Sequence, residues 1–172
     1  PAIECIRGLY NYGLYRRRGE TVEKGATVKA DKKTVKAVFY DVIKDHRLTL
    51  MGSEAAEVAS AYGIPAAPVI LTTTPEEAVA AAGKLCYPVV LKVASPKILH
   101  KSDVGGVKTG IQTPEEVRRA FIEIMESVNR YLPKVIIYGI EVQKMMPKGT
   151  ELIVGMTRDV QFGPLIAFGL GG

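Results

Sequence analysis

Apolar residues recur along the chain with two periods, and these periods divide it into helices and strands. Helical spacing is found in Ile3 to Tyr10, in Val35 to Ile43 and in Val117 to Val128. The first stripe predicts a helix that ends at Gly19, followed by a polar linker over residues 19–31. The second predicts an amphipathic helix whose apolar face needs a cover, from within this chain or from a neighbouring one.

The tetrapeptide Thr-Pro-Glu-Glu occurs at 74–77 and again at 113–116, and it predicts the start of a helix at each place. Threonine caps the helix, and proline takes the first helical position, where its missing N–H costs nothing. The glutamates favour the positive end of the helix dipole. A further short helix is expected from a cap at Ser53 through Tyr62, because Gly63-Ile64-Pro65 then ends it.

Runs of β-branched and aliphatic residues predict strands around these helices. The predicted strands are Val69–Leu71, Val89–Ala94, Val107–Gln112, Val135–Lys144, Glu151–Thr157 and Leu165–Phe168. Through the first half of Val135–Lys144 the order is β-α-β-β-α-β, which is typical of a split layout with helices on one face of a mixed sheet. The prediction is therefore an α/β fold of the α+β kind, preceded by an N-terminal helical segment. This order does not by itself specify a function.

Charge and composition narrow the possible partners. A net charge of +5 suits a polyanionic ligand, but the basic residues are dispersed apart from Arg16–Arg18, and nucleic-acid binding would rest on charge alone. No apolar run is long enough to span a bilayer and the N-terminus lacks a signal-peptide pattern, so we expect a cytoplasmic protein that binds no membrane. Cys5 and Cys86 belong to no metal-binding or CxxC pattern, and we expect two buried thiols.

The candidate chemistry is concentrated in residues 87–110, YPVVLKVASPKILHKSDVGGVKTG. Lys92 lies inside a predicted buried strand, where an ammonium group is costly to desolvate, so we expect an anion beside it. His100 follows in a polar loop, and Gly105 and Gly106 would let backbone amides approach a ligand without a Cβ. Singly, these features also fit a snorkelling lysine, a solvated histidine and a turn. Together they predict phosphate chemistry, although GGVKTG is not the phosphate loop of P-loop NTPases.

Several segments resemble the ATP-grasp portion of ADP-forming acyl-CoA synthetases of the acetate–CoA ligase type. They are AYGIP at 61–65, YPVVLK at 87–92, SPKILHKSDVGGV at 95–107, VQKMMPKGTELIVGMTRDVQFGP at 142–164 and FGLGG at 168–172. The resemblance implies that residues 1–50 are a helical tail and linker from a preceding CoA-ligase domain. It implies that residues 51–172 are an ATP-grasp domain, with a nearly complete first lobe and only the start of the second.

The resemblance also implies roles for single residues at an ATP site. Lys92 would contact the α/β-phosphates, and the backbone around Gly105 and Gly106 would cover the phosphate chain. The residues that usually hold Mg²⁺ in this superfamily would lie beyond Gly172, so no metal ligand is expected within this chain.

The adenosine end of ATP would lie against the segment that crosses between the lobes. Gln143 would face the exocyclic amine, Met145 would contact the ring, and Met146 would offer backbone hydrogen bonds. Glu151 would accept from the ribose hydroxyls. The methionines fit gap-filling in the core equally well, and Glu151 fits a solvated strand face. Glu141 occupies a position where the family is expected to have an apolar residue, and we assign it no role.

His100 stands where the family has the second histidine of a phosphoryl relay, on a mobile loop. A neutral imidazole is nucleophilic near physiological pH, and Lys101 beside it would stabilise the phosphate charge. His46, the other histidine, is expected on the surface.

The implied reaction interconverts acid, CoA and ATP with acyl-CoA, ADP and phosphate. The implied partner is a CoA-ligase domain or α subunit in a homo- or hetero-oligomer, and the isolated chain would be inactive. The small carboxylic acid is not set by this sequence. The alternative is a non-catalytic nucleotide-binding regulatory module of a synthetase-like protein acetyltransferase; retention of His100 favours catalysis.

Overall fold

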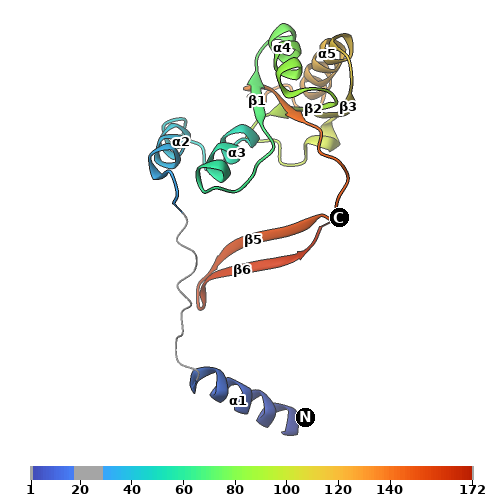
Figure 1. Ribbon diagram of the computed structural model, residues 1–172. Helices are drawn as coiled ribbons and strands as arrows, with labels where there is room; N and C mark the ends of the chain where they lie inside the picture. The colour runs from blue at the N-terminus through green and yellow to red at the C-terminus, as the bar shows by residue number, and fades with distance from the viewer. Residues whose placement is uncertain (1, 18–28, 172) are drawn as a thin grey trace.

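The computed structural model describes residues 2–17 and 29–171 (Figure 1). Its helices are α1 (Ala2–Arg17), α2 (Lys32–Lys44), α3 (Gly52–Ala61), α4 (Pro75–Leu85) and α5 (Pro114–Tyr131), with a short 3₁₀ turn, η1 (Lys101–Val104). Its strands are β1 (Val69–Thr72), β2 (Val89–Ala94), β3 (Val107–Ile111), β4 (Gly139–Lys144), β5 (Leu152–Asp159) and β6 (Gly163–Leu170). The predicted β-α-β-β-α-β order and the α+β class are confirmed.

The central sheet has the strand order β1-β4-β2-β3, and every neighbouring pair is antiparallel. The predicted mixed sheet is therefore wrong. The crossover through α4 makes β1 and β2 run the same way, but β4 inserts between them and pairs with both. The two parallel strands thus never become neighbours.

The two faces of this sheet have different chemistry. Helices α4 and α5 cover one face (Figure 1). The core between helices and sheet contains Ala78, Val89, Leu91, Val93, Val117, Ile124, Ile140 and Val142, all fully buried. Because side chains alternate along a strand, the residues between these core positions point to the opposite face. Lys92 and Glu141 are paired across β2 and β4 there, and Gln143 follows two positions along β4.

Local capping explains two of the helix starts. The side chains of Thr74 and Thr113 accept from the backbone N–H groups of Glu77 and Glu116, each at 3.2 Å, and both prolines begin their helices as predicted. The predicted cap at Ser53 is wrong. The cap residue of α3 is Met51, two positions earlier, and the N–H of Ser53 donates instead to a carboxylate that lies far away in the sequence.

The connection from α2 to α3 is held by a buried arginine. Arg47 donates to both carboxylate oxygens of Glu54, at 2.8 and 2.6 Å, and its guanidinium lies 5.4 Å from the ring centre of Tyr138. Helix α2 buries Val35, Val38 and Val42, whereas Phe39 and Ile43 of the same predicted stripe remain exposed. Helix α2 contacts α3 across the proposed boundary at residue 50, which stays a prediction.

The remaining elements pack less. Helix α1 lies apart from the sheet (Figure 1), and its apolar side chains Ile3, Ile6 and Leu9 are exposed. Most of the predicted linker, including Gly19, lies outside the described residues. Strands β5 and β6 pair with each other. The predicted strand at Val135–Lys144 begins only at Gly139, both cysteines are exposed rather than buried, and no described helix has the length and hydropathy to cross a membrane.

Candidate functional site

A cavity of about 230 Å³ lies against the sheet face that α4 and α5 leave open. Its floor is formed by Lys92 from β2 and by Glu141 and Gln143 from β4, and Lys101 reaches it from η1. The rest of its wall is made of small residues: Gly52, Ala56, Ala66, Ala67 and Val69. The charged groups on the floor and the small residues of the wall together leave space for a ligand.

Lys92 is half-buried in this cavity, and its partner is neutral. Its Nζ donates to Oε1 of Gln143 at 2.9 Å. No carboxylate among residues 2–17 and 29–171 lies within 4.0 Å of that nitrogen. Burial lowers the pKa of Lys92 and the ammonium of Lys101 lowers it further, while Glu141 raises it. The fold therefore holds a cation at the site without supplying a direct counter-ion.

Glu141 also lines this cavity, although the sequence analysis assigned it no role. It is 1% exposed, accepts from the N–H of Ser53 at 2.7 Å and lies 3.8 Å from Nζ of Lys101. A Cβ on Gly52 would come within 2.6 Å of its Oε2, so the start of α3 is shaped around this carboxylate. The signal was its spacing two residues before Gln143, which puts both on the face that carries Lys92.

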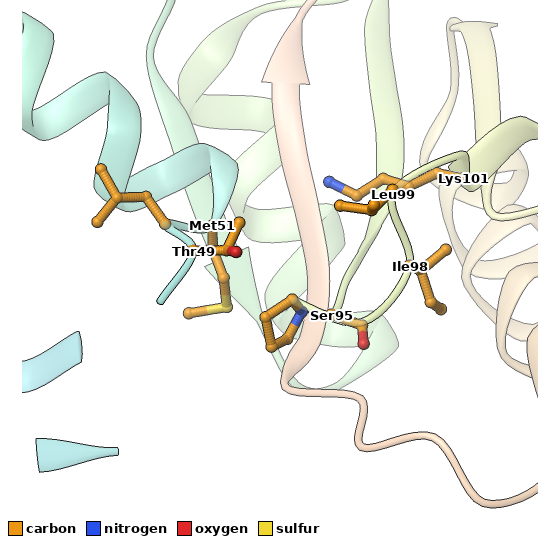
Figure 2. A pocket seen from close by; sticks show the side chains of 8 residues that line it. Thr49, Met51, Ser95, Ile98, Leu99 and Lys101 are labelled. Atoms are coloured by element: carbon orange, nitrogen blue, oxygen red, sulfur yellow. The ribbon is translucent and has the colours of Figure 1, made fainter. Parts of the chain in front are cut away.

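His100 is exposed and directly precedes η1, and its side chain does not cap that turn. Figure 2 shows the neighbouring loop, in which Lys101 extends from its backbone toward the side of Thr49 and Met51. A second cavity of about 140 Å³ is lined there by Thr49, Leu50, Met51, Ser95, Pro96, Ile98, Leu99 and Lys101. Lys101 lines both cavities, and it thereby links the His100 loop to the site of Lys92.

The glycine pair after η1 is required by the packing of the loop. Gly105 has φ +66°, and a Cβ there would lie 2.5 Å from Oγ of Ser127. A Cβ on Gly106 would lie 2.7 Å from Cγ1 of Val93. The N–H groups of Gly105 and Gly106 already donate to carbonyls of η1, at 3.1 and 2.8 Å. The amides expected to face a ligand are thus engaged within the loop.

The other predicted nucleotide contacts lie beyond the cavity lining. Met145 and Met146 are 38% and 61% exposed, so neither fills the core, and the N–H of Met145 donates to the carbonyl of Pro88 at 3.0 Å. Glu151 is exposed just before β5. The structure therefore brings Lys92 and Gln143 together and leaves these three residues on the surface. No group of three or more metal-ligating side chains occurs in the described parts of the chain.

Comparison with known proteins identifies the family of this chain. A family model described as an ATP-grasp domain matches residues 41–172. The acetate–CoA ligase (ADP-forming) I subunit beta of Pyrococcus furiosus is 48% identical over 123 residues, or 72% of this chain and 53% of the relative. Acetate–CoA ligase (ADP-forming) I of Archaeoglobus fulgidus is 39% identical over 172 residues, or 99% of this chain and 25% of the relative. The chain therefore spans about half the length of the Pyrococcus furiosus subunit and about a quarter of the length of the Archaeoglobus fulgidus enzyme.

Solved structures show the same fold. The dinucleotide forming acetyl-coenzyme A synthetase 1 of Ca. Korarchaeum cryptofilum, in complex with coenzyme A, Ca-AMPCP and HgCl⁺, matches with TM-score 0.77 and 46% identity over 80% of this chain and 60% of that one. A second structure of that synthetase, with coenzyme A and Mg-AMPPCP, has its phosphohistidine segment pointing towards the nucleotide binding site. It matches with TM-score 0.66 and 41% identity over 80% of this chain and 57% of that one. The sequence match over residues 41–172 and the shared fold agree, and this chain belongs to the ATP-grasp domain family.

Proposed function

We propose that this chain is the ATP-grasp part of an ADP-forming acyl-CoA synthetase, which interconverts acid, CoA and ATP with acyl-CoA, ADP and phosphate. The names of the curated relatives support this class of enzyme. They do not favour the alternative of a regulatory module. A CoA-ligase domain or subunit would supply the sites for CoA and for the acid, and the cytoplasm is the compartment that we expect for it.

The observation that carries the proposal is the half-buried ammonium of Lys92, which faces a cavity and has no carboxylate within salt-bridge distance among the described residues. Two lysines face one carboxylate there, so the cavity favours an anion. A phosphate group would give Lys92 an anionic hydrogen-bond acceptor, whereas the amide oxygen of Gln143 is neutral.

The rest of the nucleotide would extend along β4 toward β5. Gln143 would meet the adenine amine, Met145 would cover the ring, and Met146 would offer backbone groups. Glu151 would accept from the ribose hydroxyls. Mg²⁺ would accompany the nucleotide, and we assign none of its ligands to the described residues.

His100 would act as a phosphoryl carrier on the loop beside this cavity. An unprotonated imidazole nitrogen would attack the phosphorus atom, and the bond from phosphorus to the donor would break as the new P–N bond forms. The exposure of His100 and the position of Lys101 next to it support this role. Gly105 and Gly106 end the turn η1 that follows His100, and the backbone around them would cover the phosphate chain.

Replacement of His100 by asparagine in the complete enzyme tests the relay. With γ-labelled ATP, the wild type should carry acid-labile, base-stable label on this chain. His100→Asn should carry none, and acyl-CoA synthesis should fall by orders of magnitude. The matched control is His46→Asn, because His46 is exposed and has φ 54°, a conformation that asparagine tolerates. Near-normal turnover of His100→Asn would show that phosphate does not pass through this histidine.

A further inference from the structure

Glu141 joins three parts of the fold that are distant in the sequence. Its backbone belongs to β4, one carboxylate oxygen accepts from Ser53 at the start of α3, and the other faces Lys101 in the loop that carries His100. Its side chain is only 2% exposed. A buried carboxylate is costly unless it is paired, so its retention at this place calls for an explanation.

The two sides of this contact are held very differently. Glu141 is fixed, because the hydrogen bond from Ser53 is 2.7 Å long and Gly52 packs directly against Oε2. Lys101 is held loosely, because 3.8 Å is too long for a hydrogen bond and its side chain is 25% exposed. Among the described residues nothing accepts a hydrogen bond from Nζ of Lys101. Its bonding capacity is free for another anion.

The charge of Glu141 determines whether Lys101 can stay over the cavity. Lys92 and Lys101 line the same cavity, and like charges in a partly buried place repel each other. Glu141 is the only carboxylate among the described residues that lines this cavity. Without its charge, Lys101 would move toward solvent, and the peptide that joins Lys101 to His100 would move with it.

We propose that Glu141 is a positioning residue that keeps the loop over residues 95–106 docked on the cavity through Lys101. The inference has a second part, which rests on the proposed function: Lys101 leaves Glu141 for the phosphoryl group once His100 carries it. A phosphoryl group brings more negative charge than one carboxylate and offers three strong acceptor oxygens. Glu141 retains its bond from Ser53 after this exchange, so the loop is released while α3 stays in place.

Hydrogen exchange on the 172-residue chain tests the docking without any need for activity. Glu141→Gln keeps the side-chain shape and an oxygen that accepts from Ser53, and it removes only the charge. The amides of Gly105 and Gly106, which donate within the loop, should exchange about tenfold faster. The amide of Ile124 in the core of α5 should be unchanged.

Two further variants make this measurement specific to the ion pair. Lys101→Met should accelerate exchange of the loop amides as Glu141→Gln does, and the double variant should add nothing further. The matched control is Glu123→Gln, which removes a surface ion pair with Lys108 and should leave the loop unchanged. Unchanged loop exchange in Glu141→Gln, or additive effects of the two variants, would overturn the docking.

The release of Lys101 is tested by single-turnover transfer of phosphate from the phosphorylated complete enzyme to ADP. Glu141→Gln and Lys101→Met should slow transfer by a larger factor than they change ADP affinity, and Lys101→Arg should restore most of the rate. Equal losses in transfer and in ADP affinity would mean general damage to the cavity and would overturn this role. Normal turnover of His100→Asn would instead defeat the relay, while the exchange result on the docking would stand.

Discussion

Replacement of Lys92 by methionine should have opposite effects on stability and on binding. Methionine keeps an unbranched apolar side chain and removes the ammonium. In the unliganded chain, burial and the charge of Lys101 both lower the pKa of Lys92, so the fold disfavours the charged form. At pH 7 we therefore expect a free energy of unfolding equal to that of the wild type or higher by up to about 1 kcal/mol.

The sign of this effect should depend on pH. The cost of a charged Lys92 is fully present below its lowered pKa in the folded state, where both the folded and the unfolded chains keep it protonated. As the pH rises through the lowered pKa of the folded state toward the ordinary value of 10.5, the folded chain releases this proton first. The wild type should therefore regain stability relative to Lys92→Met over that interval. Urea denaturation at neutral pH and near pH 10 measures the difference.

Binding should change in the other direction in the complete enzyme. A charge-assisted hydrogen bond to phosphate contributes about 1.5 to 3 kcal/mol, so ATP affinity should fall about 10- to 150-fold. Isothermal titration calorimetry measures it. The matched control is Lys84→Met, which removes an exposed lysine from α4 on the other side of the sheet and should alter neither quantity. A Lys92 variant that loses stability and keeps its ATP affinity would refute the reasoning and make Lys92 a structural residue.

Two other predictions concern parts of the fold that support the site. Gly106→Ala should lower the free energy of unfolding by about 1 to 3 kcal/mol, because the new Cβ would lie 2.7 Å from Val93. Urea denaturation measures this loss. The control is Gly83→Ala, which should not be destabilised because a Cβ there would meet no atom within 4 Å. Burial opposes a lower pKa of Glu54, but hydrogen bonds from Arg47 and from a backbone N–H lower it below the ordinary 4.5. The pair of Glu54 and Arg47 therefore stabilises the fold above pH 4.5, and this stabilisation is lost as the pH falls through the pKa of Glu54 in the folded state. Glu54→Gln should flatten the acid side of a plot of melting temperature against pH. An unchanged plot would contradict this prediction.

The two helix caps that depend only on nearby residues in the sequence were predicted correctly. The caps at Thr74 and Thr113 involve residues within four positions of each other, so their geometry follows from local composition. The start of α3 could not be predicted in this way. The group that accepts from Ser53 is 88 positions away, and its arrival depends on β4 pairing in the centre of the sheet.

The candidate site also has features that local sequence predicts and features that only the tertiary fold determines. Sequence spacing was enough to place Lys92 and Gln143 on strands, and the alternation of strands then puts them on one face. The glycine pair was identified as special, but for a different reason from the one that the structure gives. The atoms that exclude a Cβ there belong to Ser127 and Val93, which only the tertiary fold brings to the loop.

The pairing of β2 with β4 makes stability and chemistry depend on the same two strands. Alternate residues of each strand pack under α4 and α5, and the residues between them present Lys92, Glu141 and Gln143 to the open face. The core residues set the register, and a shift by one position would turn every polar group into the core. The position of Lys92 opposite Glu141 is therefore fixed by apolar packing on the far side of the sheet. A ligand site built in this way does not depend on the loop with His100 to hold Lys92, Glu141 and Gln143 in place.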